Sequence, residues 1–207
     1  MRQLFLIIGA ILGWFALVTQ FYLILANRVV SVPETIFRYF SFFTILTNIL
    51  VALCLTVLLT KPLSKPGKLF SQPKTMTATT VYITIVGIIY NTILRFIWEP
   101  TGLQVVVDEL LHSVIPVLFV LYWLLFVPKA ELQWRDVLPW LLYPLVYIVY
   151  ILFRGALSGF YPYPFIDVSA IGYSKVFLNS VGLCIVFLVV SLILVAIAKR
   201  MSRNLSL

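Results

Sequence analysis

The sequence predicts an all-α integral membrane protein, a six-transmembrane-helix bundle, and three observations support that fold class. Of its 207 residues, 62% are hydrophobic and only 11% are charged. The mean hydropathy is +1.09, and so little polar surface cannot cover a water-soluble globule. Six apolar runs each approach the roughly 20 residues that span a bilayer core as a helix.

The six runs follow one another along the whole chain, so we expect residues 1–207 to form a single transmembrane domain. They cover about residues 4–26, 39–60, 77–98, 105–127, 137–155 and 176–198. The first run follows a basic residue, Arg2, as a signal peptide does, but it is too long and lacks a small-residue cleavage site. Cys54 and Cys184 fall inside runs without metal-ligand spacing, and we expect them to pack as small apolar residues.

The basic residues predict the orientation. With six spans both termini share one side, which carries ten of the fifteen Lys and Arg residues, whereas the other side carries five. By the positive-inside rule both termini are cytoplasmic, and we expect a multi-pass protein of the cell membrane. The net charge of +8 then reflects topology and anionic headgroups, so no nucleic-acid partner is expected.

Polar side chains within the runs gather toward the outer ends, where they are informative because they cost free energy in hydrocarbon. In chain order they are Ser41, Thr44 and Asn48; Asn91 and Arg95; Asp108, Glu109, His112 and Ser113; Tyr143, Tyr147, Tyr150 and Arg154; and Lys175 and Asn179. Thr44 and His112 each lie about six residues from the outer boundary of the membrane, which is a depth of roughly 9 Å at 1.5 Å per residue. This pattern predicts a polar cavity that opens to the outer face.

The fifth loop, GFYPYPFIDVSAIGY at residues 159–173, is dense in aromatic residues and prolines. Aromatic residues at this depth are typical of an interfacial belt. The alternative is that the loop forms a lid over the cavity.

The segment DELLHSVIPV contains the only histidine, His112, together with two carboxylates. Asp108 precedes it by four residues and Glu109 by three, so on a helix either carboxylate can reach the imidazole and fix its tautomer. Pro116 has no amide hydrogen, which leaves the carbonyl of His112 without its usual helical partner. This pattern favours a general base, although Arg95 could instead pair with either acid as a structural contact.

Helix 2 supplies the candidate nucleophile, Thr44 or Ser41. Amide, guanidinium and phenol groups nearby would donate hydrogen bonds to an oxyanion or a carboxylate. The structural alternative is that these hydroxyls bond to the carbonyl four residues earlier. A metal site is not favoured, since there is no second histidine and no HExxH pattern, and no cofactor motif occurs.

Three segments resemble the androgen-induced-protein family and its bacterial six-helix relatives. They are FSFFTILTNIL, LLHSVIPVLFVLYWLLF and YPYPFID. Animal members of that family are membrane threonine hydrolases that act on fatty acid esters of hydroxy fatty acids, with an essential threonine and histidine. The resemblance assigns His112 as that histidine and Thr44 as the nucleophile, with Ser41 as the rival if the register slips by three. Thr47 and Asn48 replace an acidic or amide position of the family pattern.

Together these features predict an intramembrane hydrolase of lipid esters whose partners are membrane lipids. The expected catalytic residues are Thr44, His112 and Asp108, and the expected substrate-binding residues are Ser41, Asn48, Asn91, Arg95, Glu109, Tyr147, Tyr150 and Arg154. The apolar inner half of the bundle would hold the acyl chain, and Arg95 or Arg154 a carboxylate headgroup. The alternatives are a small transporter or proton-coupled carrier, and a non-catalytic lipid-binding protein.

Overall fold

A computed structural model describes residues 1–204, and in that part of the chain all regular structure is helical. Six segments are long and apolar enough to cross a membrane, as the sequence predicts: Arg2–Ala26, Phe43–Thr60, Pro73–Phe96, Leu103–Phe126, Trp134–Ser158 and Val168–Arg203. The first two are helices α1 (Arg2–Ala26) and α3 (Phe43–Thr60). The others are α5 (Pro73–Thr92) with η1 (Leu94–Phe96); α6 (Leu103–Glu109), η2 (Leu110–Val114) and α7 (Ile115–Phe126); η3 (Trp134–Asp136), α8 (Val137–Trp140) and α9 (Leu142–Ser158); and α10 (Val168–Asn204).

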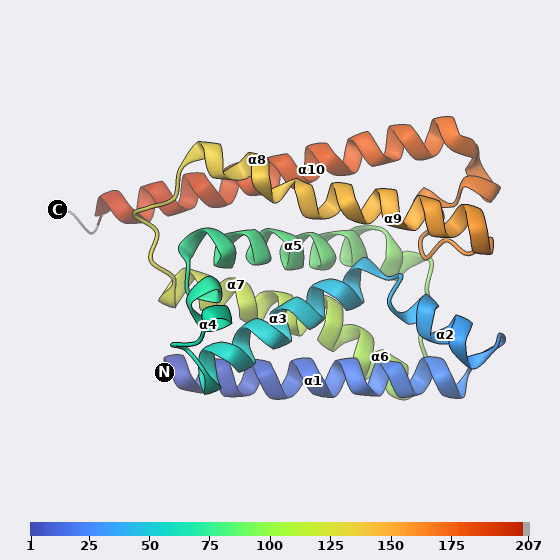
Figure 1. Ribbon diagram of the computed structural model, residues 1–207, viewed down its shortest axis with the longest axis horizontal. Helices are drawn as coiled ribbons and strands as arrows, with labels where there is room; N and C mark the ends of the chain where they lie inside the picture. The colour runs from blue at the N-terminus through green and yellow to red at the C-terminus, as the bar shows by residue number, and fades with distance from the viewer. Residues whose placement is uncertain (205–207) are drawn as a thin grey trace.

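The spanning segments run side by side, and both ends of the described chain lie at one end of the bundle (Figure 1). The short helix α4 (Lys65–Phe70) lies at this terminal end, whereas α2 (Val32–Tyr39) lies at the opposite end. The connections after α1, η1 and α9 therefore meet at what we call the α2 end. The loops that the sequence assigns to one side of the membrane are thus close together in space.

The second span begins later than the sequence predicts. Phe42 has an extended backbone with φ −81° and ψ 125°, and α3 starts at Phe43. Ser41 lies in the turn between α2 and α3, where its hydroxyl donates to the carbonyl of Phe37 at 2.6 Å. Ser41 therefore does not share a helix with Thr44 and Asn48, although the predicted run at residues 39–60 contains all three, because only the last two belong to α3.

The sixth span begins earlier than predicted, at Val168, and breaks at Gly172. Gly172 has φ +76° and ψ 161°, a conformation that a residue with a Cβ rarely adopts. The first turn of α10 consequently changes direction before the long helix continues.

At the core, α3 packs against both α1 and α5. Small residues permit the close approach to α1, since a Cβ on Gly13 would lie 3.1 Å from the Cβ of Ala52. Membrane helices commonly associate through such small residues because van der Waals packing drives their contact. This close packing holds α3, the helix that carries Thr44, in a fixed position against α1.

The fourth span contains a π-helical turn, η2, which includes His112. Pro116 cannot donate to the His112 carbonyl, and Asn91 Nδ2 on α5 donates to it instead at 3.2 Å. Gly87 allows α5 to approach, because a Cβ there would lie 3.2 Å from the same carbonyl oxygen. Single π turns often occur at functional sites, and this one sets the position of the imidazole.

The terminal end is closed by buried polar contacts. The Lys129 ammonium donates to the carbonyls of Trp123, Leu124 and Val127 at 2.7, 3.0 and 2.7 Å, and so caps the end of α7. Burial lowers the pKa of Lys129 below its usual value. Lys74 and Asp136 form an ion pair of 2.8 Å that joins the starts of the third and fifth spans.

Candidate functional site

A large cavity of about 790 Å³ lies at the α2 end of the bundle. Its walls come from α1, α2, α3, α5, α6 and η2, together with residues 97–101 and the loop at 159–167, which we call the lid loop. Thr44, Asp108 and His112 line it, and Phe160, Pro162, Tyr163 and Pro164 contribute from the lid loop. The cavity therefore brings together the residues that the sequence places at a common depth.

Hydrogen bonding fixes one orientation of the imidazole. His112 Nδ1 lies 2.9 Å from the backbone carbonyl oxygen of Asp108. A carbonyl can only accept, so Nδ1 carries the hydrogen and Nε2 carries the lone pair. The ring stacks on Tyr90 with centroids 3.9 Å apart and an angle of 11°. His112 is thus held in the tautomer that a general base requires at Nε2.

The two carboxylates adjacent to His112 contact groups other than the imidazole in this structure. Asp108 accepts from Trp98 Nε1 at 2.7 Å and from Gln104 Nε2 at 2.9 Å. Glu109 forms an ion pair of 2.5 Å with Arg95. Asp108 therefore orients the imidazole through its backbone carbonyl, while its side chain stabilises the first turn of α6 and the segment before it.

Thr44 differs from most other threonines of the spanning helices. Six of those donate their hydroxyl to the carbonyl four residues earlier: Thr56, Thr60, Thr77, Thr79, Thr80 and Thr92. Thr44 stands in the first turn of α3 and has no helical carbonyl at that position. Among the described residues its hydroxyl contacts the hydroxyl of Tyr163, at 3.5 Å. The structural alternative, in which the hydroxyl donates to the carbonyl four residues earlier, thus does not apply to Thr44.

Tyr163 contacts Thr44 twice, although the two residues are far apart in the sequence. Its hydroxyl accepts from the Thr44 backbone N–H at 3.3 Å, so it also caps an otherwise unpaired amide of the first turn of α3. Its ring stacks on Phe165 with centroids 5.2 Å apart. Burial raises the pKa of Tyr163 above its usual value, so the phenol stays protonated at neutral pH and can donate a hydrogen bond.

Thr44 and His112 line one cavity without a direct hydrogen bond between them in the described structure. Asn48 connects their two segments, because its Nδ2 donates to the carbonyl of Thr44 at 2.9 Å and to that of Leu111 at 3.2 Å. Asn48 therefore positions α3 against the π turn. It is fully buried and does not line the cavity as the expected substrate-binding role requires.

Several other expected substrate-binding residues also have structural contacts. Tyr147 donates to the carbonyl of Ser41 at 2.8 Å, and the Ser41 side chain is fully buried outside the cavity. Asn91 contacts the π turn, and Arg95 pairs with Glu109 away from the cavity wall. Tyr150 is 38% exposed on the outside of the bundle. None of these residues lines the large cavity.

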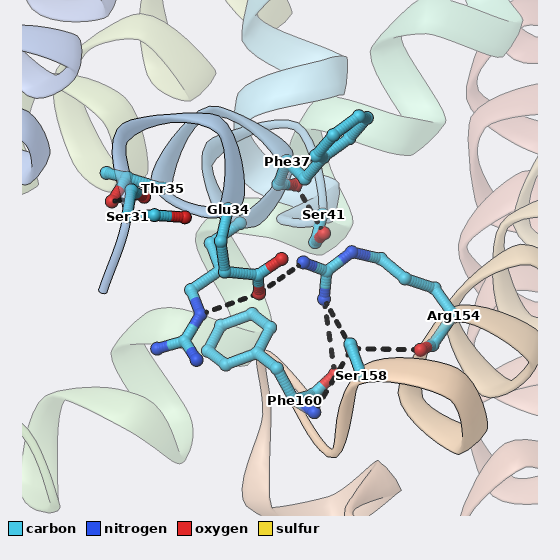
Figure 2. Close-up of polar contacts among 9 residues, drawn as sticks. Ser31, Glu34, Thr35, Phe37, Ser41, Arg154, Ser158 and Phe160 are labelled. Carbon is cyan, nitrogen blue, oxygen red and sulfur yellow. Dashed lines mark hydrogen bonds and ion pairs between the residues drawn. The ribbon is translucent and has the colours of Figure 1, made fainter. Parts of the chain in front are cut away.

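Arg154 belongs to a charged cluster that joins the lid loop to α2, shown in Figure 2. Glu34 Oε1 accepts from Arg154 at 2.8 Å and from Arg38 at 2.9 Å. Arg154 also donates to Ser158 Oγ at 3.2 Å and to the Phe160 carbonyl at 3.5 Å. We call Glu34, Arg38, Arg154 and Phe160 the latch.

The latch combines ionic and aromatic contacts. Both guanidinium carbons lie near the Phe160 ring, at 4.4 Å for Arg38 and 5.2 Å for Arg154. Partial burial disfavours the ionised form of Glu34, but hydrogen bonds from the two arginines outweigh it, so the pKa of Glu34 lies below its usual value. The ionised carboxylate therefore stabilises the contact between α2 and the segment that leads into the lid loop.

Sequence reasoning did not identify Tyr90, Tyr163 or the Glu34–Arg38 pair as parts of this site. Tyr163 lies in the YPYPFID segment and in the aromatic-rich fifth loop, but neither pattern assigned it a role. Within the described chain no group of three or more His, Cys, Asp or Glu residues could hold a metal ion. Comparison of the chain with protein-family models, with curated proteins and with solved structures found no match.

Proposed function

We propose that this protein is an intramembrane hydrolase of lipid esters, with Thr44 as the nucleophile and His112 as the general base. The proposal rests on one observation: Thr44 and His112 line the same cavity, where the Thr44 hydroxyl contacts Tyr163 and the hydrogen bond of His112 is made by Nδ1 and not by Nε2. The resemblance of three segments to the androgen-induced-protein family supports it. That resemblance favours fatty acid esters of hydroxy fatty acids as the substrate class.

The reaction would proceed through an acyl-threonine. His112 Nε2 takes the proton of the Thr44 hydroxyl, and the Thr44 oxygen attacks the ester carbonyl carbon. The bond to the alcohol oxygen breaks, and His112 returns its proton to the departing alcohol. Water then attacks the acyl-threonine with His112 as base, which releases the fatty acid and restores Thr44.

Two features of the chain favour this chemistry. Thr44 lies at the N-terminus of α3, whose partial positive charge stabilises a negative oxygen. The protonated Tyr163 phenol next to Thr44 can donate to the same oxygen. Because catalytic hydrogen bonds are often long without substrate, we expect a bound ester or a water molecule to bring Thr44 and His112 into contact.

The orientation belongs to the same proposal. The basic residues favour a cytoplasmic terminal end, which places the cavity and its lid loop on the outer side of the cell membrane. Ester substrates would then enter from the outer leaflet.

The experiment is hydrolysis of a panel of branched and simple lipid esters by the purified protein in detergent, measured by mass spectrometry. We expect Thr44→Ala and His112→Ala each to lower kcat on the order of 10³-fold or more. Thr92→Ala is the matched control, because the Thr92 hydroxyl donates within its own helix and does not line the cavity. Full activity of either site variant would refute the mechanism.

A further inference from the structure

A second, smaller cavity of about 80 Å³ lies on the other side of Thr44, between α3, α5, α9 and α10. Most of its wall is apolar, with Ile85, Val86, Ile89, Ile148, Leu183 and Phe187 among its lining residues. Two hydroxyls in its wall are already engaged, since Tyr147 donates to Ser41 and Ser180 donates to Val176. We call this space the side hollow.

Thr44 and Tyr163 line both the side hollow and the large cavity. The candidate nucleophile therefore stands in the wall between an apolar space and a larger space that contains His112. A lipid ester has the same division, with an apolar acyl chain on one side of its carbonyl and an alcohol group on the other.

The side hollow reaches the surface of the spanning segments. Ile89 on α5 and Leu183 and Cys184 on α10 line it and are each partly exposed. These residues belong to the third and sixth spans, whose exposed surface would face lipid. A chain in the hollow can therefore continue into the bilayer.

We propose that the side hollow binds the first methylene groups of an acyl chain, whose remainder stays in the membrane, while the alcohol part of the ester occupies the large cavity. The proposal deepens the hydrolase assignment and rests on it for the reaction, but chain binding can be measured separately. It replaces the sequence-based expectation that the acyl chain lies in the inner half of the bundle. The apolar hollow beside Thr44 lies instead near the α2 end.

The test uses an analogue of a long-chain ester in which an ether replaces the ester. A photoreactive diazirine stands on the long alkyl chain close to the ether oxygen, at the place where the acyl chain of the ester begins. The full-length protein in liposomes is irradiated, and the crosslinked peptides are identified by mass spectrometry. We expect crosslinks at residues that line the side hollow on α9 and α10, and their loss when an excess of the unlabelled ether is present. Crosslinks confined to the large cavity, or scattered over the lipid-facing surface, would overturn the proposal.

Two variants on α10 make the result specific. Cys184→Trp fills the side hollow and should remove these crosslinks, whereas Gly182→Trp should retain them because a side chain at Gly182 meets open space. Thermal melting checks that both variants fold. If Cys184→Trp unfolds, Cys184→Leu is used in its place.

The ether cannot be hydrolysed, so the readout does not depend on catalysis. Crosslinks in the side hollow without ester turnover would refute the hydrolase and retain the chain site. Turnover without these crosslinks would refute the chain site alone.

Discussion

At the scale of single residues, the orientation of His112 depends on a backbone carbonyl. The Asp108 carbonyl oxygen accepts from Nδ1, and the Asp108 carboxylate is held by Trp98 and Gln104. A carboxylate that stabilised the imidazolium directly would have to lie at Nδ1 itself. The geometry therefore assigns the Asp108 side chain a structural role.

This assignment predicts a small effect of Asp108→Asn. The asparagine side chain keeps one of the two accepted hydrogen bonds through its Oδ1, and the backbone carbonyl that accepts from His112 Nδ1 is unchanged. We therefore expect kcat for ester hydrolysis to stay within about tenfold of wild type. Loss of a true triad carboxylate lowers kcat by about 10⁴-fold. Steady-state kinetics distinguish these two outcomes. A decrease in kcat of about 10⁴-fold would show that the Asp108 carboxylate acts as the third member of a catalytic triad.

Tyr163 is the second residue whose proposed role in the reaction can be tested by a single substitution. Tyr163→Phe keeps the ring contacts with Phe42 and Phe165 but removes the hydroxyl next to Thr44. If that hydroxyl stabilises the transition state, kcat should fall about 10²-fold with little change in KM. Tyr161→Phe in the same loop is the control, and an equal response of the two variants would contradict the role of Tyr163.

The residue-scale site could be predicted only in part. The positions of the polar residues predicted that Thr44 and His112 lie near each other, and both line the large cavity. The partner atoms did not follow, because an i−4 spacing is satisfied equally by a side chain and by a backbone carbonyl. The contact between Thr44 and Tyr163 joins residues 119 positions apart, and no local pattern in the sequence encodes it.

At the scale of elements, the latch connects α2, α9 and the lid loop through one carboxylate. The folded-state pKa of Glu34 is lowered from 4.5. The stabilisation is therefore complete above the usual pKa of glutamate and is lost as pH falls through the lower folded-state pKa. Acidification should loosen the lid loop, and neutral pH should hold it closed.

We test this with hydrogen–deuterium exchange of residues 159–167. Glu34→Gln removes the charge at neutral pH and should raise exchange in this segment to the level that the wild type reaches in acid, after correction for intrinsic rates. Glu99→Gln, another change of an acid at the cavity wall, should leave the exchange unchanged. Equal protection in wild type and Glu34→Gln at neutral pH would show that the latch does not hold the loop.

Hydropathy predicted the positions of the long helices but not all of their boundaries. Continuous apolar runs identified all six segments that are long and apolar enough to cross a membrane. Hydropathy could not separate α2 from α3, because aromatic residues fill the turn at residues 40–42. The π turn was only suggested by Pro116, since its register depends on Asn91 and Gly87 in another helix.

At the scale of the whole molecule, most of the basic residues and the large cavity lie at opposite ends of the bundle. The terminal end holds ten of the fifteen basic residues, and the α2 end holds the large cavity and the latch. This separation predicts that the cavity faces away from the cytoplasm.

Cysteine labelling in intact cells tests that orientation. Val29 at the α2 end and Leu63 at the terminal end are 89% and 84% exposed and form a matched pair. We expect a membrane-impermeant maleimide to label Val29→Cys in intact cells, and Leu63→Cys only after permeabilisation. The reverse labelling pattern would show that the protein has the opposite orientation in the membrane, with the cavity on the cytoplasmic side.

The most direct test of the central claim is covalent capture of the nucleophile by an alkyl phosphonate electrophile that reacts with activated hydroxyl groups. Peptide mass spectrometry should locate one adduct on Thr44, present in wild type and Thr92→Ala and absent in His112→Ala. An adduct on Ser41, or none on the folded wild-type protein, would contradict the assignment of Thr44 and His112 as a catalytic pair.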